Sequence, residues 1–338
     1  MNQFYTEIEI PKYKWSAGYK DKLIFIGSCF SENIGEQLSR LKFNTDINPF
    51  GALYNPSSVL KSIKILLSEK QYKKEDLFKK DGIWGSFDHH GKFSCDTEKK
   101  TLQKINDRIN FSRPYLKQAN YLFITFGTSW VYHLKSTGEI VSNCHKFAEN
   151  NFQRELLSPE KIIKEYKKFL PELWTANPNL KIIFTVSPIR HKRDGYIDNQ
   201  ISKSVLIYAI HQIIETFGKD RCNYFPSYEI MMDELRDYRF YDSDMIHPGQ
   251  VAIDYILEKI KSTLISKESL ILMEKISKII KAREHRILHP GSESYIKFIT
   301  QNITKINDLT AKHPYLNLSE EKDYFEKKSA PKFRKEVS

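Results

Sequence analysis

KLIFIGSCFSENIGEQLSRL, residues 22–41, decides the fold because a single glycine joins two different hydrophobic patterns in it. Residues 22–26 are almost continuously apolar and predict a short buried strand that ends at Gly27. From residue 30 to residue 41 the apolar side chains recur at helical spacing, so a helix is expected directly after the strand. A strand, a tight turn and a helix in this order are typical of an α/β protein.

The same alternation recurs along the chain. Further buried strands are predicted over 120–127, 181–186 and, more weakly, 223–225, with helices over 55–67, 102–109, from Ser158, over 205–217 and over 248–264. Short apolar strands separated by helices indicate a parallel sheet covered on both faces, which makes a three-layer sandwich. In such sheets the reactive groups gather beyond the carboxyl ends of the strands. Ser28-Cys29, Gly127-Thr128-Ser129 and Ser187-Pro188 all follow predicted strands, so we expect them at one edge.

The pattern changes after residue 265. Helices are predicted over 268–284 and 292–304, and the basic ending KKSAPKFRKEVS is expected to be loose. We therefore predict an α/β domain over 1–265 and a helical extension over 266–338 that packs on it.

Composition narrows the class of protein. The chain has 338 residues and a formal net charge of +11, but its Lys and Arg residues are interleaved with Glu and Asp. This pattern favours a solvated surface, and no nucleic-acid partner is expected. The N-terminus has no secretory pattern, no apolar run approaches the roughly 20 residues of a membrane span, and four scattered cysteines form no pairing motif. We expect a cytoplasmic protein.

No cofactor or metal is expected. Asp88-His89-His90 with Cys95 is the densest group of possible ligands, but adjacent histidines in an extended segment rarely bind one ion. No second cluster has ligand spacing.

The turn after the first strand places Ser28 and Cys29 at a helix N-terminus. Unpaired N–H groups and the helix dipole favour negative charge there, so a cysteine in that position can have a lowered pKa and act as a nucleophile. The alternative is that Cys29 is a small buried hydrophobe and Ser28 merely caps the helix.

The second chemical signal is FYDSDMIHPGQVAIDYI, residues 240–256. Asp244 precedes His247 by three residues, so its carboxylate can accept a hydrogen bond from Nδ1 of the imidazole. That bond fixes the tautomer and leaves Nε2 free as a base. An ordinary turn with an exposed histidine is the alternative.

Taken together, these two segments resemble the SGNH-hydrolase layout, which begins with a Gly-Asp-Ser block and ends with Asp-x-x-His. A closer resemblance is to the GSCFA family, because Gly27-Ser28-Cys29-Phe30-Ser31 is similar to its naming motif. Further stretches also resemble that family: NPFGALYNP (48–56), FGTSWVY (126–132), NCHK (143–146), SPIRH (187–191), FPSYEI (225–230) and AREHR (282–286). The resemblance implies an SGNH-like fold and a bacterial protein.

The resemblance also implies roles for individual residues. Cys29 falls on the nucleophile position, with Ser28 as the alternative. Gly51, after Asn48, falls on the glycine whose N–H helps to form the oxyanion hole. Gly127 to Ser129 falls on the Gly-x-Asn block, so Ser129 replaces the usual asparagine donor. Loss of one such donor costs about 10²–10³ in rate.

Other polar residues are candidates for substrate binding. Asn143 is a candidate for the missing amide donor. Arg190, His191 and His145 either meet an anionic group of the substrate or pair with surface carboxylates.

The function expected from these residues is acyl-ester chemistry. Cys29 attacks an ester or thioester, His247 moves the proton and Asp244 orients it. Water as acceptor makes an esterase, and a sugar hydroxyl makes an O-acyltransferase, with acyl-CoA as one candidate donor. The alternative is a non-catalytic SGNH shell that binds a glycan or a protein partner.

Overall fold

A computed structural model describes residues 6–285 and 292–329 of the chain. Its centre is a five-stranded sheet in which all neighbouring strands are parallel. The strands are β10 (Cys222–Phe225), β9 (Lys181–Val186), β5 (Tyr121–Phe126), β1 (Lys22–Gly27) and β2 (Asn44–Ile47), in this spatial order. The predicted parallel sheet is therefore confirmed.

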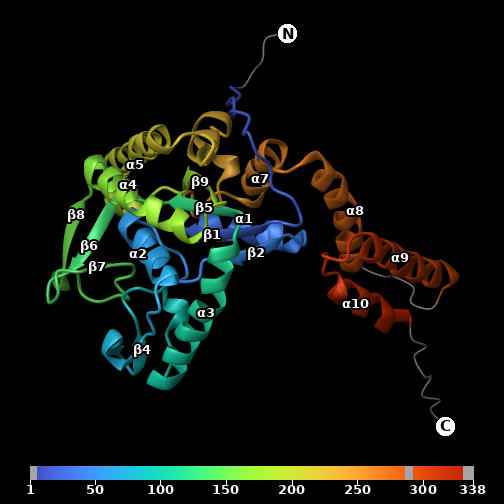
Figure 1. The fold of residues 1–338 in the computed structure, drawn as a ribbon, viewed down its shortest axis with the longest axis horizontal. Coiled ribbons are helices and arrows are strands. Elements are labelled where there is room, and N and C mark those ends of the chain that lie inside the picture. The colour runs from blue at the N-terminus through green and yellow to red at the C-terminus, as the bar shows by residue number, and fades with distance from the viewer. Residues whose placement is uncertain (1–5, 286–291, 330–338) are drawn as a thin grey trace.

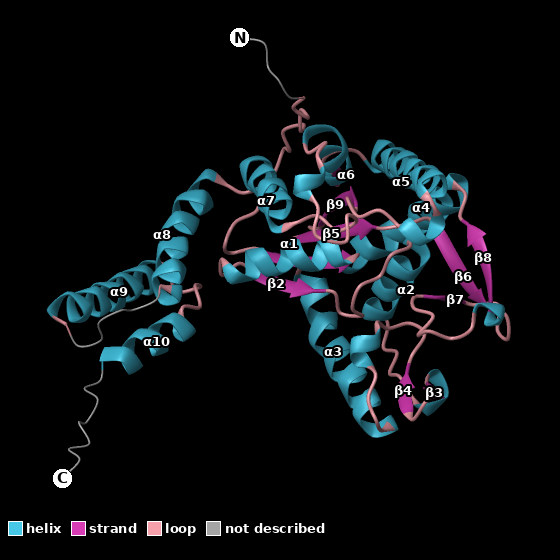
Figure 2. Ribbon diagram, turned by 180° about the vertical axis from the view of Figure 1, so that it is seen from behind, coloured by secondary structure: helices cyan, strands magenta, loops and turns pink. Residues whose placement is uncertain are grey.

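Helices cover both faces of the sheet (Figures 1 and 2). One face is packed by α2 (Pro56–Leu67), α3 (Glu98–Gln118), α4 (Pro159–Ala176) and α5 (Tyr196–Phe217). The other is packed by α1 (Cys29–Arg40) and α7 (Gln250–Leu264). Alternate residues of each strand enter the two cores: Ile24 and Ile26 on the first face, Leu23 and Phe25 on the second. The three-layer architecture follows from this alternation.

The sheet topology creates a crevice at the strand ends. From β1 the chain first adds β2 on one side and later adds β5 on the other. Connections that leave a strand toward opposite sides open a crevice beyond its carboxyl end. Ser28, Gly127 and Ser187, which follow β1, β5 and β9, lie at this edge.

Two small antiparallel sheets lie outside the central sheet, and neither was predicted. One consists of β6 (Trp130–Leu134), β7 (Ile140–Val141) and β8 (Phe152–Leu156), in the order β7-β6-β8. We call it the wall sheet. The other is a hairpin of β3 (Phe78–Lys80) and β4 (Ile83–Gly85).

Three helices follow the α/β body: α8 (Lys267–Glu284), α9 (Glu293–Lys312) and α10 (Ser319–Ser329). Figure 1 shows them at one side of the molecule. The fully buried carboxylate of Glu321 joins α10 to its surroundings, since it lies 2.9 Å from Lys42 and 2.7 Å from Arg283. Apolar side chains of these helices continue the core on the α1–α7 face. The boundary at residue 265 stays a prediction, and Arg286 and most of the basic ending lie outside the described residues.

Candidate functional site

A glycine turn brings Ser28 and Cys29 to the end of the sheet. Gly27 has a φ of +149°, and a Cβ built on it would lie 2.2 Å from the carbonyl oxygen of Thr125. Only glycine fits here. The Ser28 N–H donates to that oxygen (3.1 Å), and the buried Asn48 side chain accepts from the Gly27 N–H (2.9 Å). Asn48 therefore holds the turn and does not border the cavity described below.

Ser28 and Cys29 differ in how they meet solvent. Ser28 occupies the N-cap position of α1, but its side chain makes no capping hydrogen bond. The residue is 1% exposed, and its Oγ has no partner among the described residues. Cys29 is the first residue of α1 and is partly exposed. Its pKa is raised, because burial outweighs the N–H groups of Cys29 and Phe30 that favour the thiolate. The expected lowering of this pKa was wrong: desolvation is larger than the effect of the helix terminus.

Asp244 and His247 form the expected pair. Oδ2 of Asp244 lies 2.5 Å from Nδ1 of His247, and Oδ1 accepts the backbone N–H groups of His247 (2.9 Å) and Ile246 (2.8 Å). These hydrogen bonds lower the pKa of Asp244 to about 2, so the carboxylate is charged at neutral pH. Asp244 thus caps the turn and also holds the imidazole of His247 in one orientation.

An open cavity of about 550 Å³ lies at the strand ends. It brings together many of the residues singled out from the sequence: Ser28, Cys29, Asn143, His145, Arg190, His191 and His247. The wall sheet supplies one side of it through Trp130, Tyr132 and Phe152. This cavity is the candidate active site, and we call it the catalytic cavity for that reason.

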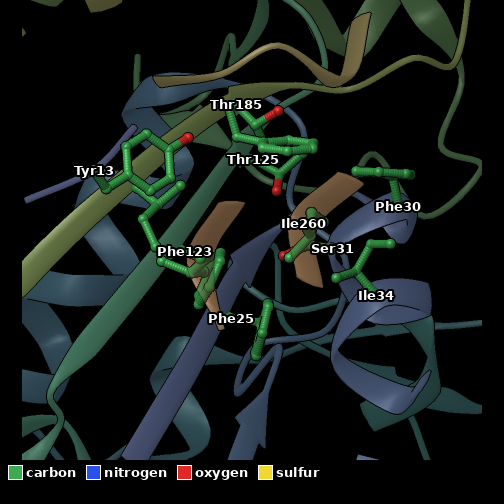
Figure 3. Close-up of a pocket in the computed structure, with 12 residues that line it drawn as sticks. Tyr13, Phe25, Phe30, Ser31, Ile34, Phe123, Thr125, Thr185 and Ile260 are labelled. Carbon is green, nitrogen blue, oxygen red and sulfur yellow. The ribbon is translucent and has the colours of Figure 1, made fainter. Parts of the chain in front are cut away.

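A second, small apolar space lies between α1, α7 and the sheet (Figure 3). Phe25, Phe123, Ile34 and Ile260 line it, and the rings of Phe25 and Phe123 stack at 4.3 Å between centroids. Its volume is about 20 Å³. That is room for one water molecule and not for an acyl group, so this space belongs to the core.

The oxyanion roles expected for Gly51 and Ser129 do not fit this structure. The Gly51 N–H donates to the carbonyl oxygen of Asn48 at 2.8 Å, inside a turn where Gly51 has a φ of +78°. Ser129 is fully buried, and its N–H and Oγ both bond to the Ser202 hydroxyl, at 2.8 and 3.1 Å. The neighbouring Thr128 borders the cavity instead.

Gly127 has a spacing role. Its N–H donates to the carbonyl of Tyr54 at 2.7 Å, and a Cβ built on it would lie 3.2 Å from His191 and 3.2 Å from Tyr54. The glycine therefore lets these two rings approach the strand end.

Two amides at the cavity can donate hydrogen bonds. Asn55 caps α2, with Oδ1 accepting the Ser58 N–H at 2.8 Å, and its Nδ2 has no partner among the described residues. Asn143 accepts the His145 N–H at 2.8 Å in the same way, and its Nδ2 is likewise unpaired in the part of the chain that the structure describes. Asn55 was read from the sequence only as a helix start, so its place at the cavity was missed.

Lys203 is the main residue that sequence reasoning missed. It is 0% exposed, and Nζ donates to the carbonyl oxygens of Gly127 and Ser187, both at 2.7 Å. Burial lowers its pKa to about 7. Its charge lowers the pKa of Cys29 and contributes to lowering that of His191. A lysine between two serines on a helix gives no sequence signal for burial.

The two other histidines of the cavity are poor bases. Burial, with the charges of Lys203 and His247, lowers the pKa of His191 to about 4. His145 binds the Ser86 carbonyl through Nε2 at 2.9 Å, and burial lowers its pKa as well. Both are neutral at pH 7, which leaves His247 as the candidate base.

The residues that the structure describes contain no group of three or more His, Cys, Asp or Glu side chains placed to hold a metal ion. His89 is fully buried and stacks on Phe50, with ring centroids 4.6 Å apart. None of the described helices is both long and apolar enough to cross a membrane.

Comparison with known proteins places these residues in a family. The model of the GSCFA family matches residues 22–260, and that of the GSCFA domain protein, C-terminal domain, matches residues 276–330. Among solved structures, one match is an acetyl xylan esterase from the rumen bacterium Butyrivibrio proteoclasticus. Its identity is 13%, its TM-score 0.35, and the match covers 75% of this chain and 66% of the esterase, slightly less than two thirds. No curated protein matches the sequence significantly.

Proposed function

The chain belongs to the GSCFA family, and we propose that it cleaves or transfers an acyl ester or thioester with Cys29 as nucleophile. The observation that carries the proposal is one cavity bordered by both Cys29 and His247, with Asp244 holding the imidazole. A nucleophile, a base and a group that orients the base are the parts that covalent acyl transfer needs.

The proposed reaction begins with proton transfer. The raised pKa keeps the Cys29 thiol protonated at neutral pH, so His247 Nε2 must remove the proton as Sγ attacks the acyl carbon. The tetrahedral oxyanion accepts hydrogen bonds from the N–H at the start of α1 and from the Asn55 or Asn143 amide. Collapse breaks the bond to the leaving alcohol or thiol, which takes the proton from His247. Water or a hydroxyl acceptor then attacks the acyl-cysteine by the reverse sequence.

For the acceptor we propose water or a carbohydrate hydroxyl, and acyl-CoA is one candidate donor. The aromatic side chains Trp130 and Tyr132 on the wall sheet support a substrate with flat apolar faces.

The competing proposal is a binding protein without catalysis. It is favoured by the backbone of Gly51 and Ser129, whose N–H groups are already bonded within the protein. If Asn55 and Asn143 do not replace them, the oxyanion is poorly stabilised and the cavity only binds its ligand.

Intact mass and turnover test the proposal. The protein is incubated with p-nitrophenyl acetate and with acetyl-CoA, and an adduct of one acetyl group on Cys29 is expected. Cys29→Ala should lose at least about 10³ of the turnover rate, whereas Ser28→Ala, the matched control in the same turn, should keep most of it. Unchanged thermal unfolding of Cys29→Ala shows that the loss is chemical. Full turnover by Cys29→Ala with an inactive Ser28→Ala would move the nucleophile to Ser28.

A further inference from the structure

Arg190 stands between two cavities. It follows β9 and borders the catalytic cavity on one side. On the other side it borders a second open cavity of about 480 Å³. This tyrosine cavity is lined by Arg190, Tyr196, Arg236, Tyr238, Tyr241 and Met245, among others. Its lining also includes one carboxylate, that of Asp237, whose Oδ1 accepts the Arg239 N–H at 2.9 Å and lies 4.0 Å from the Arg239 guanidinium. A ligand bound to Arg190 can therefore reach into either cavity.

The guanidinium of Arg190 has no carboxylate within ion-pair distance among the described residues. Its Nη2 contacts the sulfur of Met232 at 3.1 Å, its Nε is buried without a hydrogen-bond partner, and its centre lies 5.8 Å from the ring of Tyr196. A partly buried guanidinium without an acidic partner is unusual, because its five N–H donors need acceptors.

Neighbouring arginines show the ordinary arrangement. Arg154 pairs with Asp194 at 2.5 Å, and Arg193 pairs with Glu149. The expectation that Arg190 pairs with surface carboxylates therefore does not fit the described structure. The other expectation, that it meets an anionic group of the substrate, remains.

Two further features of the surroundings favour an anionic ligand. The two acidic side chains at the catalytic cavity, Glu149 and Asp194, are used in those ion pairs, whereas Lys146 and Lys192 also border it. In the tyrosine cavity, Tyr196 and Tyr238 are 56% and 76% exposed. Exposed aromatic rings gathered beside arginines that have no ion pair among the described residues are typical of a binding surface.

We propose that Arg190 binds a carboxylate or phosphate group of the ester or thioester that reacts at Cys29, and that the tyrosine cavity holds the adjoining part of that substrate. Arg suits both anions because its planar fork donates two parallel hydrogen bonds. This inference rests on the proposed acyl-transfer function. The anion has two possible sources, the carboxylate of a sugar acid or the phosphates of an acyl carrier such as coenzyme A.

Matched substrates test the subsite in the full-length protein. Acetyl-CoA is compared with S-acetyl-N-acetylcysteamine, which lacks phosphates, and an O-acetylated glucuronate with its O-acetylated uncharged amide. The expected preference in kcat/KM for the charged member of one pair is about ten- to hundredfold. Arg190→Met should lower that preference to about one. Arg221→Met, which removes a guanidinium that borders neither cavity, should leave the preference unchanged.

The outcomes distinguish failure of the Arg190 subsite from failure of the proposed acyl-transfer function. The pair that shows the preference identifies the phosphate or the carboxylate as the source. Equal kcat/KM for charged and neutral members of both pairs, unaltered in Arg190→Met, overturns the subsite while the acyl chemistry stands. If no ester reacts, the proposed function fails, and calorimetric binding of coenzyme A and glucuronate to Cys29→Ala with and without Arg190→Met decides the subsite alone. Arg190→Lys serves if the methionine variant does not fold, and should retain only part of the preference.

Discussion

Replacing Lys203 by methionine tests the buried charge beneath the catalytic cavity. Burial lowers the pKa of Lys203 to about 7 in the folded protein, whereas the unfolded chain titrates this group near about 10.4. Between these values the unfolded chain holds a proton that the native state has released. The free energy of unfolding therefore rises with pH in this window. Below about pH 7 both states are protonated and the contribution to the slope ends.

The magnitude follows from the same two values. One pKa unit corresponds to about 1.4 kcal/mol, so Lys203 adds about 1 kcal/mol to the free energy of unfolding between pH 7.5 and pH 8.5. Methionine has no proton to release, and this contribution disappears in Lys203→Met. The unfolding free energy of the wild type, relative to the variant, should therefore increase by about 1 kcal/mol over that interval. The difference at any single pH also contains the loss of two hydrogen bonds to Gly127 and Ser187.

Urea unfolding at pH 7.5, 8.0 and 8.5, followed by tryptophan fluorescence at constant ionic strength, measures this difference. The raised pKa values of Cys29, Cys144 and Cys222 lower stability above pH 8, but they do so in both proteins. Lys203→Arg is the control, because a guanidinium keeps its proton throughout the interval. Parallel stability curves for the wild type and Lys203→Met would refute the assignment of this proton. Loss of the charge should also move the pH profile of turnover to higher pH, since Lys203 favours the Cys29 thiolate.

Three other changes have defined outcomes. Asp244→Asn should lower kcat by about 10²–10⁴, because the imidazole loses the partner that sets its tautomer, with urea unfolding as the check that stability is kept. Gly27→Ala should lower the free energy of unfolding by more than about 2 kcal/mol, since the added carbon meets the next strand; an unchanged unfolding midpoint contradicts this. Iodoacetamide should label Cys29 before the fully buried Cys222, faster as pH rises because the Cys29 pKa is raised, and mass spectrometry of timed digests shows the order.

The central strands were predictable because each is a continuous apolar run that both cores require. The edge strand β2 was not, since Asn44–Ile47 is largely polar and pairs with β1 alone. The wall sheet was missed because strands of two to five residues with mixed burial give no clear period.

The candidate site, too, was predictable only in part. The Asp244–His247 bond lies within one turn, so residue spacing predicts it. The Ser129 N–H bonds to Ser202, which is distant in the sequence, and the burial of Lys203 likewise depends on distant segments. The Gly51 N–H bonds to the nearby Asn48, in a turn that the residue types alone do not specify. Spacing along the sequence does not contain that information.

The wall sheet has a consequence for how the shape of the cavity can change. Its side chains form one side of the catalytic cavity, yet its strands pair with none of the five strands of the central sheet, whose β1 leads to Cys29. Arg154 of β8 links the wall sheet to the segment that follows β9, because its guanidinium pairs with Asp194. The same guanidinium lies 3.7 Å from the ring centre of Trp130. Exchanges of the wall side chains that face the cavity can therefore reshape it while the turn at Ser28 and Cys29 keeps its geometry. Val131 is different, because it is fully buried in the main core and ties the wall sheet to the scaffold.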